Sequence, residues 1–183
     1  MTYDQTEGIP KQALDEGRRL NYTDTADKGT DWLCSIDYIE WQNEVYILDI
    51  YMSDLSMETT EPDVADMLVK DSIEEATVES NSGGRGWGRN VKRLMFERHG
   101  SNKCVIVDKN QTANKEARIL SSAGWVKEHI YLPPQYKSKY PDFSQQVHGY
   151  QKKGKNAHDD APDVLAGIYE QVTGTQKTFR MSL

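Results

Sequence analysis

Three acidic clusters, far apart along the chain, constrain its fold more than any other feature. The first runs from Asp24 to Asp31, the second begins at Glu79, and the third runs from His158 to Asp163. The first two clusters lie at the ends of strand-like runs, and the third opens a helix-like run. A fold that brings strand ends and a helix start together would gather several carboxylates at one point.

Gathered carboxylates repel one another unless a cation neutralises them. Magnesium and manganese are hard divalent cations that prefer oxygen ligands and keep some of their own waters. One or two such ions can support phosphodiester hydrolysis, by activating a water and by stabilising the leaving 3′-oxygen. The acidic clusters therefore predict a metal-dependent nuclease site, with Asp24, Glu79 and Asp160 as catalytic ligands and Asp159 beside them.

Each acid also has an ordinary structural interpretation. Asp24 fits a turn residue that accepts a hydrogen bond from its own backbone. Glu79 closes an apolar strand-like run, where a merely solvated carboxylate is uncommon. Asp160 and Asp163 suit a helix N-terminus. Helical spacing also places Asp160 on the core side, and the choice of third ligand among Asp159, Asp160 and Asp163 stays open.

Size and composition fit one domain. The chain has 183 residues, enough for a sizeable core. Its mean hydropathy of -0.77 and the absence of any long apolar run exclude a membrane-spanning helix. The two cysteines, Cys34 and Cys104, lie in separate apolar runs and are predicted to be buried free thiols in a reducing cytosol.

The net charge of -7 is unusual for a protein that binds DNA tightly, because contacts with phosphates dominate such affinity. Basic residues are nevertheless clustered, and these clusters predict weak, metal-assisted DNA binding. The two clusters are Arg85, Arg89, Lys92, Arg93 and Arg98 in one stretch and Lys152, Lys153 and Lys155 in another.

Hydrophobic periodicity predicts three consecutive antiparallel strands followed by alternating helices and strands. The predicted strands are 18–23, 32–41, 44–52, a short buried strand ending at Glu79, and a buried strand 104–107. One predicted helix starts at Pro62. The other predicted helices are 88–99, 114–123, 140–150 and 159–172; Gly124 is expected to end the second of these and Gly174 the last. Residues 131–134 are expected to be extended. The expected fold is a mixed five-stranded sheet flanked by helices.

The glycine-rich stretch from Gly83 to Gly88 invites comparison with phosphate-binding loops. It lacks the Gly-Lys-Ser/Thr ending of a P-loop, and no such ending occurs anywhere in the chain. A nucleotide-binding protein is therefore disfavoured, and this chain is not expected to hydrolyse ATP by itself.

Four motifs in order resemble the C-terminal nuclease domain of tailed-bacteriophage terminase large subunits. The motifs are Asp24-x-Ala26-x-x-Gly29-x-Asp31, Glu79-Ser80-Asn81 with Gly83, Asn114-Lys115-Glu116-Ala117-Arg118, and His158-Asp159-Asp160-x-x-Asp163. The resemblance covers residues 18–174, with a polar lead-in at 1–17 and a C-terminal tail at 175–183. It implies a ribonuclease-H-like fold and a metal-dependent endonuclease that cuts concatemeric phage DNA during genome packaging.

The resemblance also implies roles for individual residues and partners. It places Asp24, Glu79 and Asp159 or Asp160 at the metal. Lys115 and Arg118 resemble the family's basic helix start, which contacts DNA or orders the core. The basic stretch with Arg85, Arg89 and Lys92 is predicted, from its clustered charges, to contact DNA phosphates. The implied partners are double-stranded DNA, the terminase ATPase domain, the small terminase subunit and the portal protein, in a bacterial host cytoplasm and without a membrane.

Two alternatives stay open at this point. A junction resolvase or transposase-like nuclease would use the same fold and the same acids on a branched substrate. A non-catalytic module that docks onto a portal or capsid protein would suit the acidic balance, although the acidic set is complete in this chain. The motor function of full-length large subunits is not assigned to these residues, and the chain is expected to be an excised domain or a separately encoded piece.

Overall fold

The fold is known from a computed structural model, which describes residues 8–25, 32–79, 84–151, 156 and 158–180. Several residues singled out by the sequence lie outside the described ones, including Asp27, Asp31, Asn81, Gly83 and the basic residues 152, 153 and 155. In two segments, 84–85 and 175–180, only the backbone is described.

The first three strands form the antiparallel unit that the alternation predicts. They are β1 (Arg18–Asp24), β2 (Leu33–Trp41) and β3 (Glu44–Ser53). Strands β2 and β3 form a hairpin closed by Gln42 and Asn43, whose φ values of 52° and 68° are those of a tight turn that follows the sheet twist. The predicted tight connection at these two residues is confirmed.

The remaining strands extend this unit on both sides. They are β4 (Glu75–Glu79), β5 (Val105–Lys109) and β6 (Ile130–Tyr131). The sheet has the order β5-β4-β1-β2-β3-β6, with β4 parallel to β1 and β5 parallel to β4. In this register Asp24 lies beside Glu79, so the ends of β1 and β4 bring the first two acidic clusters together.

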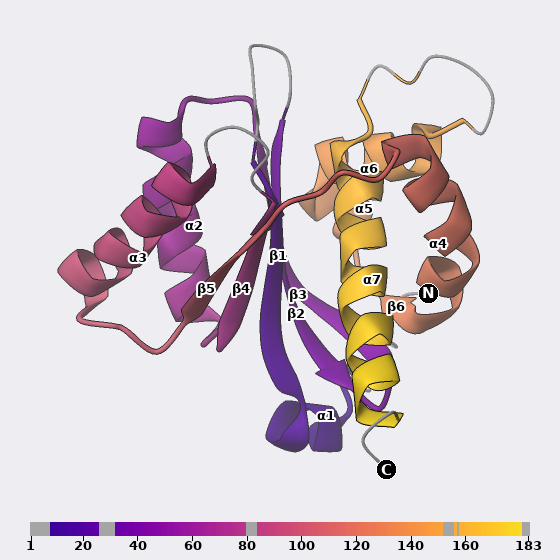
Figure 1. The fold of residues 1–183 in the computed structure, drawn as a ribbon, viewed down its shortest axis with the longest axis horizontal. Coiled ribbons are helices and arrows are strands. Elements are labelled where there is room, and N and C mark those ends of the chain that lie inside the picture. Colours follow the sequence, from indigo (N-terminus) through magenta and orange to yellow (C-terminus); the bar gives the residue numbers. More distant parts are fainter. Residues whose placement is uncertain (1–7, 26–31, 80–83, 152–155, 157, 181–183) are drawn as a thin grey trace.

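Helices cover both faces of the sheet (Figure 1). They are α1 (Lys11–Glu16), α2 (Met57–Lys70), α3 (Gly84–His99), α4 (Lys115–His129), α5 (Tyr136–Lys139), α6 (Pro141–Gly149) and α7 (Asp160–Arg180). Helices α2 and α3 enclose one core with β4, and α5, α6 and α7 enclose the other with β1, β2 and β3. Within the described residues, no helix is both long and apolar enough to span a membrane.

The mixed α/β fold is confirmed, but the sheet has six strands where the sequence predicts five. The additional strand β6 has only two residues, which is too short to leave a period in the sequence. Strand β5 was expected to be buried, yet it lies at the edge of the sheet with Val105 56% exposed. Apolar composition alone does not distinguish a central strand from an edge strand.

Several helix ends differ from those predicted. Helix α2 begins at Met57, which leaves Pro62 inside it, and α3 begins at Gly84. Helix α4 continues through Gly124 to His129, and α7 continues through Gly174 to Arg180. A glycine inside a helix costs only about 1 kcal/mol relative to alanine, so it does not have to end one. The expected lead-in contains α1, which buries Ala13.

Both cysteines are buried and free, as predicted. A buried acid, which the sequence did not reveal, lies on the same strand as Cys34. Asp37 on β2 has no exposed surface, and Asn21 Nδ2 donates a hydrogen bond to its Oδ1 at 2.7 Å. Burial raises the pKa of Asp37 well above its ordinary value; the bond from Asn21 lowers it, and the neighbouring Asp71 carboxylate raises it again.

Replacing Asp37 with asparagine is expected to stabilise the protein at pH 8 and to change little at pH 5. A raised pKa means that the folded state binds more protons than the unfolded state above about pH 4. Stability conferred by the protonated form is therefore lost as the pH rises through the folded pKa. A neutral amide at this position avoids that loss, with an expected gain of about 1–3 kcal/mol at pH 8.

Thermal unfolding of the wild type and of Asp37→Asn between pH 5 and 9 tests this expectation. A gain of this size raises Tm by roughly 3–10 °C in a domain of this length. Asp54→Asn serves as the control, because Asp54 is exposed just after β3. An equal difference in Tm between Asp37→Asn and wild type at every pH would contradict the assignment of the buried titrating group.

Candidate metal centre

Three carboxylates from different elements converge at the ends of β1 and β4. One carboxylate oxygen from each of Asp24, Glu79 and Asp163 lies within 4.8 Å of the others. Asp24 ends β1 and Glu79 ends β4, while Asp163 lies in the first turn of α7. This is the convergence of strand ends and helix start that the acidic clusters predict.

A close contact between α7 and β1 brings Asp163 to this point. Asp163, Gly167 and Glu170 are spaced by four and three residues, so they lie on one face of the helix. A Cβ atom on Gly167 would lie 2.2 Å from Cζ of Tyr22, so only glycine lets the helix pack directly on this ring. The close packing directs Asp163 and Glu170 toward the ends of the strands.

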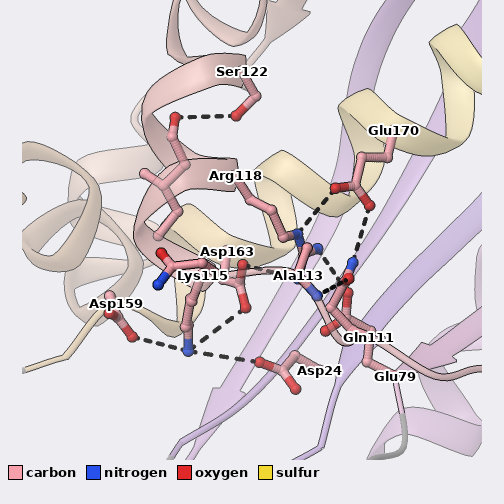
Figure 2. A network of polar contacts seen from close by, with 12 residues as sticks. Asp24, Glu79, Gln111, Ala113, Lys115, Arg118, Ser122, Asp159, Asp163 and Glu170 are labelled. Atoms are coloured by element: carbon pink, nitrogen blue, oxygen red, sulfur yellow. Dashed lines mark hydrogen bonds and ion pairs between the residues drawn. The ribbon is translucent and has the colours of Figure 1, made fainter.

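Asp159 and Asp160 lie beside these three acids, and Lys115 contacts both; Asp159 is partly exposed at the rim of the site, whereas Asp160 is buried. The Nζ atom of Lys115 lies 2.9 Å from Asp159, 3.4 Å from Asp160, 3.7 Å from Asp163 and 3.9 Å from Asp24. Figure 2 shows this ammonium among the acids. The structure thus brings all four predicted acids to one place but adds Asp163 to the group around Asp24 and Glu79.

Arg118 divides its guanidinium among three acids (Figure 2). Its Nη2 lies 2.8 Å from Glu79, its Nη1 lies 3.2 Å from Asp163, and its Nε lies 3.0 Å from Glu170. The side chain of Arg118 is only 4% exposed. Of the two roles that the resemblance offers, this geometry fits ordering the core rather than contact with a DNA phosphate.

The environment raises the pKa of Asp24 and of Asp163. Burial raises the pKa of Asp24 well above its ordinary value, Lys115 opposes this, and the charges of Glu79 and Asp163 add to it. Burial also raises the pKa of Asp163 to about 6, against the opposing effects of Arg118 and Lys115. Lys115 and Arg118 thus offset only part of the cost of burying the negative charges of Asp24 and Asp163.

Lys115 responds to the same charges in the opposite direction. Burial lowers the pKa of Lys115, but the hydrogen bond to Asp159 and the charges of Asp24 and Asp160 raise it. The raising effects together outweigh burial, so the net shift is upward. Among the described residues, the five carboxylates of Asp24, Glu79, Asp159, Asp160 and Asp163 form ion pairs with two cationic side chains, Lys115 and Arg118. The site therefore keeps a formal negative charge that suits a divalent cation.

The donor set also fits such an ion. All candidate ligands are carboxylate oxygens, which magnesium and manganese prefer. Oδ1 of Asp163 is buried and receives no hydrogen bond among the described residues. Asp24 is partly accessible, whereas Glu79 and Asp163 are 4% exposed, so a cation could enter from the side of Asp24.

The predicted DNA-binding residues lie in two places. Arg89 and Lys92 are exposed on α3, whose buried face carries Trp87, Val91 and Met95. Arg85 lies in the first turn of this helix, and its side chain is outside the described residues. Lys115 and Arg118 instead lie on α4 inside the acidic cluster. Arg89 and Lys92 thus lie on the exposed side of α3, whereas Lys115 and Arg118 contact the acids directly.

Sequence reasoning did not identify Glu170, Tyr22 or Lys109 as part of this site. Lys109 Nζ lies 2.8 Å from Glu170 and donates a hydrogen bond to the Tyr22 hydroxyl at 3.0 Å. The spacing of seven residues between Asp163 and Glu170 places both on one helix face and was an available signal. Tyr22 and Lys109 left no such signal, because their contacts depend on the packing of the sheet.

No known family model matches the chain, and no curated protein matches it. Several solved structures are similar to it. The human cytomegalovirus terminase nuclease domain, soaked with manganese and bound to an inhibitor, has a TM-score of 0.61 and 12% identity over 93% of this chain and 89% of that chain. A K428A mutant of the large terminase subunit from bacteriophage Sf6, with calcium, has a TM-score of 0.56 and 9% identity over 85% and 92%.

Another similar structure comes from a different class of nuclease. The Holliday junction resolvase of fowlpox virus has a TM-score of 0.52 and 17% identity over 84% of this chain and 97% of that chain. At such low identities the likeness concerns the fold. The chain therefore has the ribonuclease-H-like fold that the motifs predict, the fold shared by viral and phage terminase nuclease domains.

Proposed function

We propose that this chain is the nuclease domain of a terminase large subunit, a divalent-metal-dependent endonuclease that cuts concatemeric DNA during genome packaging. The observation that carries the proposal is the convergence of Asp24, Glu79 and Asp163 within 4.8 Å at the ends of adjacent strands. The order of the four motifs and the likeness to terminase nuclease folds support the same assignment.

In this proposal Asp24, Glu79 and Asp163 hold magnesium or manganese, with the buried Asp160 beside them and Asp159 at the rim. The ion, when bound, supplies an activated water and stabilises negative charge on the phosphate. Arg118 holds Glu79 and Asp163 in place, and Lys115 balances the acids that face solvent. Arg85, Arg89 and Lys92 on α3 contact DNA phosphates without reading sequence.

Cleavage of supercoiled plasmid by this chain tests the proposal. Nicking or linearisation is expected with manganese or magnesium and is expected to be absent with EDTA. Absence of cleavage with any divalent ion, together with no binding of manganese to the protein, would overturn the metal-nuclease assignment.

The three aspartates of α7 are expected to differ in this assay. Asp163→Asn should reduce the rate by more than about 100-fold, because Asp163 lies among the central acids. Asp159→Asn should reduce it by less than about 10-fold, because the Asp159 side chain is 35% exposed and contacts Lys115. Asp160→Asn is expected to be intermediate. Equal losses in all three variants would contradict the choice of Asp163 as the third ligand.

A junction-resolving nuclease is the second candidate, because the fowlpox virus resolvase has a similar fold. Substrate preference distinguishes the two functions. A terminase nuclease should cut a linear duplex at least as fast as a four-way junction of the same length. Preferential, symmetric cutting of the junction would favour the resolvase instead.

A further inference from the structure

Tyr22 is buried in the core and contacts Glu79, one of the proposed metal ligands. Its hydroxyl donates a hydrogen bond to Oε1 of Glu79 at 2.5 Å. Tyr22 is fully buried in β1 and Glu79 is 4% exposed in β4. In the parallel register Tyr22 pairs with Thr77 of β4. Glu79 comes two residues after Thr77, so the side chain of Tyr22 points toward the end of β4 where Glu79 lies.

The direction of this hydrogen bond is fixed by Lys109. An ammonium group can only donate, and Lys109 Nζ lies 3.0 Å from the Tyr22 oxygen. The hydroxyl therefore accepts from Lys109 and turns its own hydrogen toward Glu79. Glu170 holds Lys109 in turn at 2.8 Å, and the same Glu170 also accepts from Nε of Arg118.

The ring of Tyr22 has little freedom to move. Gly167 lies directly against it, and even one added carbon on that glycine would come within 2.3 Å of two ring atoms. Lys109 also lies 5.2 Å from the ring centroid, on its face. The helix and the lysine thus hold the hydroxyl at one position relative to Glu79.

The two hydrogen bonds to Glu79 fall on the same oxygen. Arg118 Nη2 and the Tyr22 hydroxyl both donate to Oε1. A carboxylate held in this way has one rotational position, and its other oxygen, Oε2, receives neither bond. Because neither of these bonds occupies Oε2, that oxygen can act as a ligand for a cation.

We propose that Tyr22 is a positioning residue of the metal centre, which orients Glu79 so that its second oxygen faces Asp24 and Asp163. The inference rests on the proposed metal-nuclease function. Groups that fix the orientation of a metal ligand change metal affinity or activity by about 10–100-fold when they are removed. A tyrosine that served only to fill the core would affect stability alone.

The test compares Tyr22→Phe with Tyr38→Phe. Tyr38 is an apt control because it is also fully buried, lies on the next strand β2, and donates from its hydroxyl to Gln171 of α7 at 3.0 Å. Binding of manganese is measured by the electron paramagnetic resonance signal of the free ion, and Tm is measured in EDTA. Tyr22→Phe should weaken manganese binding by about 10-fold or more, and Tyr38→Phe should leave it unchanged.

The outcomes separate this inference from the function on which it rests. If the wild type binds manganese and both phenylalanine variants bind it equally well, the positioning role is wrong while the metal centre stands. If the wild type binds no manganese, the proposed function itself fails. Should Tyr22→Phe not fold, Lys109→Met carries the test, because it removes the donor that orients the hydroxyl and keeps the ring. A loss of about 3-fold or more in manganese affinity would support the role, and unchanged affinity would overturn it.

Discussion

Replacing Asp24 with asparagine is expected to abolish metal-dependent DNA cleavage, by more than about 100-fold, while leaving the metal-free protein as stable as wild type or more so. The loss follows because Asp24 is the most accessible of the three central acids and sits where a cation would enter. An asparagine has the same shape but offers no negative charge to that ion.

The stability half of this expectation has a separate physical cause. Burial raises the pKa of Asp24, and Glu79 and Asp163 repel its charge, so the folded state holds this carboxylate at a cost that Lys115 only partly offsets. A neutral amide removes the repulsion. A stabilising change that destroys activity is the behaviour of a residue kept for function rather than for folding.

Two measurements check the expectation together. Plasmid cleavage with manganese gives the activity, and Tm with and without manganese gives the stability. In the wild type, ion at 100 times its Kd adds about 2.7 kcal/mol, and Asp24→Asn should lose most of that gain. Asp15→Asn is the control, because Asp15 lies on the exposed surface of α1 before β1 begins. Undiminished cleavage by Asp24→Asn would remove Asp24 from the mechanism.

The residues at strand ends could be predicted from the sequence, because their signals are local. The apolar run before Glu79 ends at a carboxylate, and Asp24 follows a short alternating run. In the structure these residues pair directly in the register of β1 and β4. The antiparallel start and the alternating elements after it predict a mixed sheet, but they do not predict the order in which its strands lie.

The third ligand was not accessible in the same way. Asp159, Asp160 and Asp163 all fit a helix start, and periodicity does not say how closely that helix approaches the sheet. The approach depends on Gly167 lying against Tyr22, a contact between residues far apart in the sequence. From sequence alone, a glycine inside a helix indicates only a weak helix former. Its role in close packing becomes clear only when the residue that it packs against is known.

The role of Arg118 was open for a related reason. A basic residue at a helix start near a nuclease site suits a phosphate contact as well as an internal ion pair. Its burial and its three carboxylate partners decide the matter, and both depend on the packing of α4 against α7. Composition gives charge, but only packing tells which charges are removed from water.

Replacing Arg118 with methionine is expected to destabilise the protein by about 3–5 kcal/mol, the usual cost of leaving a buried charge without its partner. Glu79 and Glu170 each lose a hydrogen bond and Asp163 loses an ion pair, and Glu79 and Asp163 are almost fully buried. In a domain of this length the expected fall in Tm is roughly 6–20 °C. An Arg118→Lys variant would restore the positive charge, but its single ammonium group could not contact three acids at once as the planar guanidinium does.

Arg98→Met provides the matched control. Arg98 also makes two hydrogen bonds to a carboxylate, at 2.8 and 2.5 Å to Asp66, but its side chain is 47% exposed. Exposed pairs contribute less than about 1 kcal/mol, so this variant should unfold within a few degrees of wild type. Equal losses in the two variants would contradict the importance of burial at Arg118.

The dependence on pH and metal identifies the cause of the loss at Arg118. The destabilisation should be largest at pH 8 and smaller at pH 5, because the pKa of Asp163 is already about 6 and its protonation removes the charge that needs a partner. Manganese should restore part of the lost stability in Arg118→Met, since a divalent ion among the same acids replaces some of the missing positive charge. A loss that changed with neither pH nor manganese would mean that Arg118 contributes through its packed stem, and that the carboxylates need no internal cation.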